Sequence, residues 1–386
     1  MRILFTLTKT INPSEGGVQH TTFKLGRFFT QRGLDVYYYS LKNDGHVPAQ
    51  YGQLSHSPKS GGLKVSSNSE HMAEFIREVR PDVVINQMPY EIELRQQLRV
   101  LADELGFHFL GCLRNSLFSF KNNALNIAKQ HLPVWIHRLI PNRILESVIL
   151  KRHVIRHKSD LLDIIDKHDY FILLAPPNRD ELEYYIRDYK NEKIISIPNS
   201  IPSVQESVPV KKKTLLFVGR LNVQHKRADL IIPLWAGLVD KLPEWEFKVV
   251  GSGEYFEKLK QELAAVKLPR ITLEGFQSSL DYYPEASILF MPSAYEGFPN
   301  VLLEAQSFGC IPVAYKSYKA VEWIVNDGED ALLIEPFDID KMSQSIVKLA
   351  TDDRQRAKMA EAGLINARRF TIDKIGQKWL EFFDSL

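Results

Sequence analysis

Short apolar runs alternate with stretches of helical periodicity along the whole chain, and this alternation limits the possible folds more than any other feature. Segments such as Thr21–Arg32 and Glu93–Leu105 carry apolar residues at helical spacing, and the short runs between such segments have the length of buried strands. The same pattern begins again after residue 200. The predicted strands are Ile3–Thr8, Val36–Leu41, Val83–Asn86, Phe107–Cys112, Phe171–Leu174, Thr214–Val218, Glu246–Val250, Ile271–Glu274, Ile288–Met291, Ile311–Ala314 and Ala331–Ile334.

Strands that alternate with helices, without a run of hairpins, predict parallel sheets built from βαβ units. Because the pattern occurs twice in 386 residues, we expect an α/β protein of two doubly wound domains. Prolines and charges between Ile197 and Lys213 favour a boundary there, with residues 1–199 in the first domain and 200–370 in the second. The long polar segment Asn43–Ser69 is predicted to be a loop that lies on the surface or over a cleft.

Composition argues against several classes of protein. A net charge of +2 does not suggest a nucleic-acid-binding protein. Cys112 and Cys310 are too far apart for a disulfide framework or a metal site, and this cysteine usage fits the cytoplasm. No apolar run approaches the roughly 20 residues of a membrane-spanning helix. The basic, helical segment 137–163 leaves two interpretations, a solvated helix face or a peripheral contact with the inner face of an anionic membrane.

The segment Tyr295–Ala305 is the most informative part of the sequence. Pro299 suits the first turn of a helix, so we expect Glu296 in the preceding loop and Glu304 within the helix. The helical rise of 1.5 Å per residue separates the two glutamates by roughly 7–8 Å along the axis. Two carboxylates at this separation can hold the two ends of one extended ligand.

This segment, EGFPNVLLEA, resembles the E-x7-E signature of retaining glycosyltransferases of the GT-B fold and is similar to glycosyltransferase family 4. The resemblance implies two Rossmann-like domains with an interdomain cleft, and a last helix, residues 371–386, that packs back on the first domain. Further motifs that resemble the family are Phe217–Leu221 with Lys226, Val250–Gly253, Gly275-Phe276 and Ile197–Ile201, with Arg227 where the family has glycine.

The resemblance also implies roles for individual residues. Arg220 and Lys226 would stabilise the departing diphosphate, because two cations beside it favour the transition state over the ground state. Glu296 would bind the hydroxyls of the donor sugar and completes the catalytic set, while Glu304 would bind the ribose. The remaining residues expected at the donor are Gly16, Gly17, Gly219, Gly251, Gly275, Phe276, Gly297, Phe298, Asn300 and Val301, although Gly16 and Gly17 also fit a simple turn.

One position departs from the family pattern. Members commonly carry a histidine after a strand of the first domain, whereas this chain has Leu113-Arg114-Asn115. A guanidinium does not deprotonate, so Arg114 is not a general base. Arg114 and Asn115 are candidates for the acceptor or donor side, where Arg114 would bind an anionic group, and a plain salt bridge is the alternative.

The resemblance therefore implies a retaining, metal-independent transferase without a cofactor. It would move a hexose or N-acetylhexosamine, commonly from a UDP-sugar, to a glycan or lipid-linked acceptor in bacterial surface-polysaccharide synthesis. Asp338 and Asp340 directly precede a predicted helix, which favours a helix cap over a metal site. Two other functions also fit the sequence, a nucleotide-sugar epimerase on the same fold and a sugar-nucleotide-binding protein without transferase activity.

Overall fold

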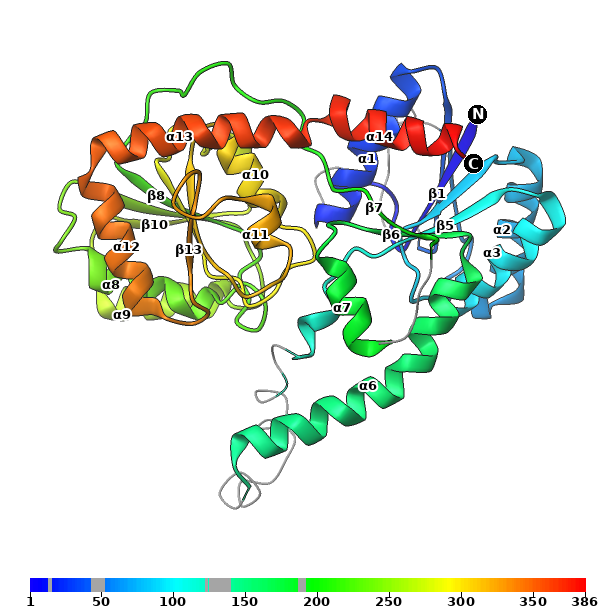
Figure 1. The fold of residues 1–386 in the computed structure, drawn as a ribbon, viewed down its shortest axis with the longest axis horizontal. Helices are drawn as coiled ribbons and strands as arrows, with labels where there is room; N and C mark the ends of the chain where they lie inside the picture. Colours follow the sequence, from blue (N-terminus) through cyan, green and yellow to red (C-terminus); the bar gives the residue numbers. More distant parts are fainter. Residues whose placement is uncertain (13–15, 43–52, 122–123, 125–139, 187–191) are drawn as a thin grey trace. The chain divides into compact units, whose positions relative to one another are not determined.

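The computed structural model describes residues 1–12, 16–42, 53–121, 124, 140–186 and 192–386, which form two compact units (Figure 1). Unit 1 comprises Met1–Asn115, Ala124–Ser200 and Ile372–Leu386, and unit 2 comprises Ser116–Asn123 and Ile201–Thr371. Each unit is built around one sheet in which all the described strand pairs are parallel. The predicted α/β class with two Rossmann-like domains is confirmed.

Unit 1 has a seven-stranded sheet in the order β3-β2-β1-β4-β5-β6-β7. Its central strands are apolar on both faces because helices cover the sheet from both sides. One core joins α1 and α14 to the sheet, and a second core joins α2 and α3. The elements are β1 (Arg2–Leu7), α1 (Gly16–Gln31), β2 (Asp35–Ser40), β3 (Gln53–His56), α2 (Ser66–Val79), β4 (Val83–Asn86), α3 (Ile92–Leu105), β5 (His108–Cys112), α6 (Asn142–Lys167), β6 (Tyr170–Leu173), α7 (Asn178–Tyr185), β7 (Ile194–Ser196) and α14 (Ile372–Asp384).

The C-terminal helix α14 belongs to unit 1 and contacts α1 (Figure 1). Trp379 and Phe383 of α14 share a buried core with Phe28 and Phe29 of α1. A side chain at Gly376 would lie 2.3–2.6 Å from the Phe28 ring, so the bare glycine allows the two helices to approach closely.

Unit 2 has a six-stranded sheet in the order β10-β9-β8-β11-β12-β13. Its largest core is formed by the sheet together with α8, α9, α12 and α13, around the fully buried Trp235. The elements are β8 (Thr214–Val218), α8 (Ile231–Leu238), β9 (Glu246–Val250), α9 (Phe256–Val266), β10 (Ile271–Gly275), β11 (Ile288–Met291), α10 (Asn300–Gln306), β12 (Ile311–Tyr315), α11 (Val321–Ile324), β13 (Leu332–Ile334), α12 (Ile339–Thr351) and α13 (Asp353–Ala367).

Three features of unit 1 differ from the sequence-based expectation. The segment Asn43–Ser69 is not all loop, since it contains β3 and the start of α2. Strand β3 has one apolar side chain and, among the described strands, pairs only with β2, so it carries no strand-like pattern. The edge strand β7 was also not predicted, because it is only three residues long. Helix α1 begins at Gly16, whereas the predicted helix begins at Thr21. The first turn lacks apolar periodicity, so the sequence did not indicate it.

The predicted basic helix is α6, and the part of that prediction at residues 137–139 lies outside the described residues. Among the described helices, α6 included, none is both long enough and apolar enough to cross a bilayer.

Both sheets reverse their strand order at one point, between β1 and β4 in unit 1 and between β8 and β11 in unit 2. In doubly wound sheets ligands bind outside the carboxyl ends of the strands at such a reversal. The loops that follow these four strands are therefore the first place to look for a site.

Candidate functional site

In unit 2, the loops after β8 and β11 meet at the strand reversal. The Nζ atom of Lys226 lies 2.5 Å from Oε1 of Glu296, and Nε2 of His225 lies 3.2 Å from Oε2 of the same carboxylate. The backbone N–H of Ala294 donates to the carbonyl of His225 at 2.8 Å. Two predicted catalytic residues, Lys226 and Glu296, are thus brought into direct contact.

The Glu296 carboxylate is buried and remains ionised. Burial alone would raise its pKa, but the Lys226 ammonium and the His225 ring outweigh burial and lower the pKa to about 2. Glu296 is therefore a hydrogen-bond acceptor over the whole physiological range of pH.

The loop that carries Lys226 is built by residues that the sequence did not single out. The Asn222 side chain accepts hydrogen bonds from the backbone N–H groups of His225 and Lys226. Arg227 then adopts a left-handed conformation with φ of 52°, which explains why the family has glycine at this position. The Arg227 guanidinium pairs with Asp229, so it is held away from the Lys226–Glu296 pair.

Arg220, the third predicted catalytic residue, has an exposed side chain. Within the part of the chain that the structure describes, its guanidinium has no hydrogen-bond or ion-pair partner. The loop after β8 thus holds two paired cations, Lys226 and Arg227, and Arg220, which can accept an anionic ligand without breaking a contact in the described part of the chain.

Three predicted glycines line the carboxyl edge of neighbouring strands. The N–H of Gly219 donates to Val250, and the N–H of Gly251 donates to Gly275. A side chain at Gly251 would lie 1.9 Å from the carbonyl oxygen of Gly219, so this turn accepts glycine alone. The ring of Phe276, which follows Gly275, is exposed.

The motif helix α10 begins at Asn300, with Pro299 as its N-cap rather than in its first turn. Glu304 lies in this helix and accepts a hydrogen bond from the buried Tyr283 hydroxyl at 3.3 Å. Phe298 is buried, with its ring 6.0 Å from the ring of Phe370, so its side chain supports the loop from inside unit 2. The partly exposed residues Gly297 and Val301 lie on either side of the helix start.

Two buried hydroxyl groups near Glu296 were missed by sequence reasoning. Among the described residues, the hydroxyls of Ser293 and Tyr318 have no hydrogen-bond partner although both are buried. Burial and the nearby Glu296 carboxylate raise the pKa of Tyr318 well above its usual range. A hydrogen bond of 2.6 Å from Ser317 Oγ to the Ser293 carbonyl joins the loops after β11 and β12. No sequence signal marks Tyr318, because only the pairing of β11 with β12 brings it here.

The other predicted residues lie in unit 1. Gly16 and Gly17 are exposed at the start of α1, and Gly16 has a φ of 70°. Arg114 and Asn115 follow β5, with Asn115 exposed. No acidic side chain of the described chain pairs with Arg114, so the salt-bridge alternative is not observed.

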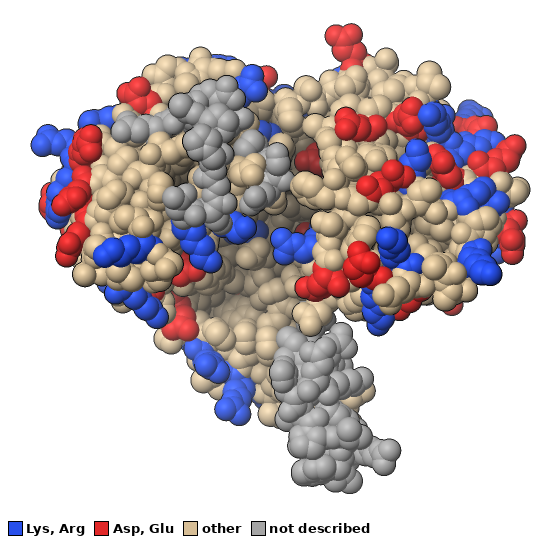
Figure 2. Space-filling view, turned by 180° about the vertical axis from the view of Figure 1, so that it is seen from behind, with Lys and Arg blue, Asp and Glu red and all other residues tan. Residues whose placement is uncertain are grey.

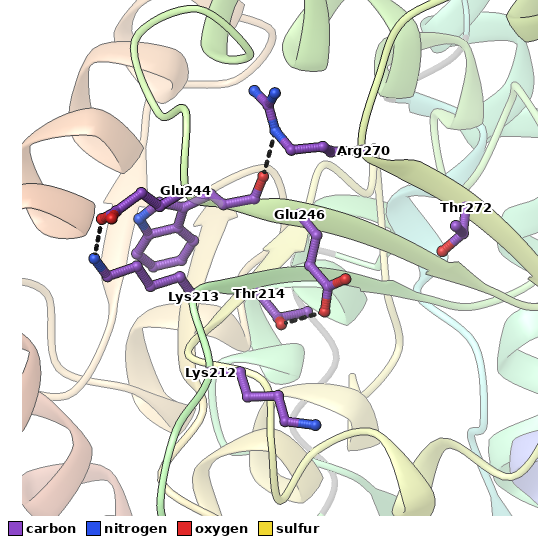
Figure 3. Close-up of a pocket in the computed structure, with 8 residues that line it drawn as sticks. Lys212, Lys213, Thr214, Glu244, Glu246, Arg270 and Thr272 are labelled. Carbon is purple, nitrogen blue, oxygen red and sulfur yellow. Dashed lines mark hydrogen bonds and ion pairs between the residues drawn. The ribbon is translucent and has the colours of Figure 1, made fainter.

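A surface pocket of about 320 Å³ lies at the opposite, amino-terminal edge of the unit 2 sheet (Figure 3). Many of its polar groups are bonded within the lining: Lys213 pairs with Glu244, Thr214 donates to Glu246, and Arg270 donates to the Trp245 carbonyl. None of the predicted site residues lines it. These contacts stabilise the sheet edge.

The Asp338 side chain caps α12 by accepting a hydrogen bond from the N–H of Lys341 at 2.8 Å, which confirms the predicted helix cap. In the described ranges no group of three or more His, Cys, Asp or Glu side chains is arranged to hold a metal ion.

Comparison with known proteins gives a family match for most of unit 2. Residues 201–364 match the sequence model of the family Glycosyl transferases group 1. An uncharacterized glycosyltransferase of Haemophilus influenzae is 27% identical over 313 residues, which are 76% of this chain and 83% of that protein. The poly(glycerol-phosphate) alpha-glucosyltransferase of Bacillus subtilis is 29% identical over 175 residues, or 45% of this chain and only 26% of that protein.

The fold also occurs in solved structures. The structure of Anabaena HepE in complex with UDP and glucose has a TM-score of 0.72 at 16% identity and covers 100% of both chains. The GT-B fold expected from the sequence is thereby confirmed. The match of residues 201–364 to the group 1 model and the similarity to the Haemophilus protein identify the chain as a glycosyltransferase.

Proposed function

We propose that the chain is a retaining glycosyltransferase that uses a nucleotide-diphosphate sugar, with UDP as the nucleotide. In this proposal unit 2 binds the donor and unit 1 binds the acceptor, a glycan or lipid-linked glycan of a bacterial surface polysaccharide. The observation that carries the proposal is the open Arg220 guanidinium in the same loop as Lys226, which pairs with the buried Glu296 carboxylate at the strand reversal. The UDP and glucose bound by HepE and the polymer acceptor named for the Bacillus relative are further support.

The described side chains suit the chemistry of such a transfer. The acceptor hydroxyl oxygen forms a bond to the anomeric carbon on the face from which the diphosphate leaves with its electron pair, and a phosphate oxygen takes the hydroxyl proton. Arg220 and Lys226 stabilise the charge that develops on the diphosphate. Ionised Glu296 accepts hydrogen bonds from the sugar, and Glu304 accepts them from the ribose. The backbone of Gly275 and Phe276 faces the base.

Metal independence is part of the proposal. Two cations in the loop after β8 can supply the charge stabilisation that a divalent ion supplies in other enzymes. Full activity after dialysis against a chelator is the expected result. Activity that is lost on chelation and restored by Mg²⁺ or Mn²⁺ would refute this part.

The test of the function is a two-step experiment. A thermal-shift screen of UDP-, GDP- and ADP-sugars identifies the donor, because a ligand specific for the folded state raises the melting temperature. The stabilising donor is then incubated with a panel of glycan acceptors. We expect released UDP and a glycosylated acceptor. A new sugar isomer without released nucleotide would indicate an epimerase, and tight binding with neither product would indicate a binding protein.

Contact with an anionic membrane through α6 is also part of the proposal. Ile144, Val148 and Ile155 are 55%, 59% and 76% exposed, and their spacing places them on one helix face. Lys151 lies on the same face, and the segment 147–159 contains no acidic residue. Figure 2 shows basic side chains beside uncharged surface on the arm that α6 forms. An apolar stripe with flanking cations is typical of helices that lie on anionic lipid surfaces.

Vesicle co-sedimentation tests this contact. Each basic residue near an anionic surface contributes about 1 kcal/mol, so a Lys151→Glu/Arg152→Glu variant should bind phosphatidylglycerol vesicles at least about 30-fold more weakly. The matched control is Arg354→Glu/Lys358→Glu on the exposed face of α13. Equal binding to neutral phosphatidylcholine vesicles, or an equal loss in the control, would contradict a specific contact through α6.

A further inference from the structure

Arg114 follows β5 in unit 1, and among the described residues its guanidinium is bonded only to neutral groups. Its Nε donates to Oε1 of Gln87, which follows β4, and its Nη1 donates to Oδ1 of Asn199 at 2.9 Å. The remaining nitrogen, Nη2, is buried and has no partner in the described part of the chain. Burial lowers the pKa of Arg114, as expected for a cation without a counter-ion.

The Gln87 side chain also has a buried donor group without a hydrogen-bond partner in the described part of the chain. It is 4% exposed, and its Nε2 group has no hydrogen-bond partner among the described residues. Because the carbonyl oxygen of the same amide accepts from Arg114 Nε, the two unused donor groups belong to side chains in direct contact. Each buried donor without a partner is destabilising, so two of them side by side indicate a ligand that completes them.

Unit 1 also contains a buried arginine, Arg95, whose charge has a structural partner. The Arg95 side chain is 4% exposed, and it pairs with Asp163 at 2.6 Å and donates to the Pro89 carbonyl at 2.7 Å. Its charge is compensated by a carboxylate, as is usual for a buried ion. Arg114 differs because it lies at the carboxyl edge of the sheet, beside the strand reversal between β1 and β4.

We propose that Arg114 and Gln87 bind one oxyanion group, a carboxylate or a phosphate, of the acceptor. The two N–H bonds of Nη2 and the amide N–H bonds of Gln87 offer several donors to one anion, whose charge would compensate the guanidinium. Asn199 is a positioning residue, since it holds Nη1 and leaves Nη2 for the ligand. That the oxyanion belongs to the acceptor rests on the proposed function, whereas oxyanion binding by unit 1 does not.

Calorimetric titration of the whole protein with glycerol 3-phosphate and with glucuronate tests the site and distinguishes its two chemistries. We expect saturable binding of at least one probe, weakened by about 10- to 100-fold in Arg114→Gln and by a smaller factor in Gln87→Leu. Arg99→Gln is the control, because Arg99 is a cation of the same unit that is already paired with Asp103 and Asp169. Arg114→Lys keeps the charge but lacks the planar fork, so it should restore binding only in part.

Several outcomes would overturn the proposal. They are the absence of saturable binding of both probes to the wild-type protein, wild-type affinity in Arg114→Gln, and an equal loss in Arg99→Gln. A melting temperature of Arg114→Gln that falls with probe binding unchanged would mean that Arg114 is structural. None of these measurements uses the nucleotide-sugar, so failure of sugar transfer would remove the proposed function and leave the oxyanion site standing.

Discussion

The two units have the same architecture, but they differ in the charged group at the carboxyl edge of the sheet. This group has an oppositely charged partner in unit 2 and has none among the described residues in unit 1. In unit 2 the buried Glu296 carboxylate is compensated by Lys226 in the neighbouring loop. In unit 1 the Arg114 guanidinium donates to the amide oxygens of Gln87 and Asn199, and no described carboxylate pairs with it. An ion pair is stable in the folded protein without a ligand, whereas a buried cation without a counter-ion is stabilised when an anion binds to it. The difference indicates that the two edges serve ligands of different chemistry.

The largest expected effect separates the two cations of unit 2. Lys226→Ala and Arg220→Ala should each reduce turnover by on the order of 10²-fold or more, as expected for the loss of a preorganised charge. Only Lys226→Ala should also destabilise unit 2, because it leaves the Glu296 carboxylate buried without its main partner. Steady-state rates and calorimetric melting measure the two effects. Wild-type rates in both variants would refute the assignment of the cations.

The two glutamates of the motif, Glu296 and Glu304, are expected to contact different parts of the donor in unit 2. Glu304→Ala should weaken binding of UDP itself by about 10- to 100-fold, because a charged acceptor of the ribose is lost. Glu296→Ala should spare UDP and weaken only the UDP-sugar. Isothermal calorimetry with both ligands measures this division, and equal effects of the two variants on UDP would contradict it.

The pH dependence of stability should differ between the units. Burial lowers the pKa of His168 in unit 1 to about 4, from an ordinary value of 6.5. The unfolded chain therefore gains a proton below pH 6.5 that the folded ring refuses, so stability is complete above pH 6.5 and falls as the pH decreases toward 4. In unit 2 the Glu296 pair contributes fully above pH 4.5 and is lost only as the pH falls toward 2.

The variant His168→Gln isolates the contribution of His168 to the loss of stability at acid pH. Between pH 6.5 and 5 the wild-type protein should lose roughly 2 kcal/mol more than His168→Gln, at 1.36 kcal/mol per pKa unit. Denaturant unfolding at several pH values is the measurement. Equal losses in the two proteins would show that His168 does not control the acid sensitivity of unit 1.

The smallest expected effect concerns a hydroxyl that the sequence did not reveal. Tyr318→Phe removes the buried hydroxyl near Glu296 and keeps the ring, so it should weaken UDP-sugar binding by about two- to tenfold and leave UDP unchanged. The control is Tyr315→Phe, whose buried hydroxyl likewise has no partner among the described residues but whose ring packs on Phe337. A loss of the same size in both variants would exclude a specific role for Tyr318.

The sequence predicted much of unit 2 because its signals are local. Strands β8, β9 and β11 match the predicted bounds residue for residue. Strands β8 and β11 are largely apolar and buried, whereas β9 combines buried apolar residues with the partly buried Glu246 and Lys248. The Lys226 and Glu296 motifs each lie in a short continuous segment, so their resemblance to family motifs could be recognised in the sequence. Their direct contact was not predicted, because it depends on the pairing of β8 with β11.

In unit 1 the relevant signals are not local. Gln87 and Arg114 lie 27 residues apart, and only the pairing of β4 with β5 brings their loops together. Gln87 follows a strand without any motif, so nothing in the sequence marks it. The edge strand β3 was missed because its residues lack the apolar run that identifies a buried strand.

The most direct test of the central claim compares the same substitution at the two edges. Unfolding free energies of Lys226→Met and Arg114→Met are measured in buffer free of phosphate and carboxylate. We predict that Lys226→Met lowers the free energy of unfolding, because it orphans a buried carboxylate, and that Arg114→Met leaves it unchanged or raises it, because it removes a buried charge that no anion compensates. A loss of similar size in both variants would contradict the claim that the two edges treat buried charge in opposite ways.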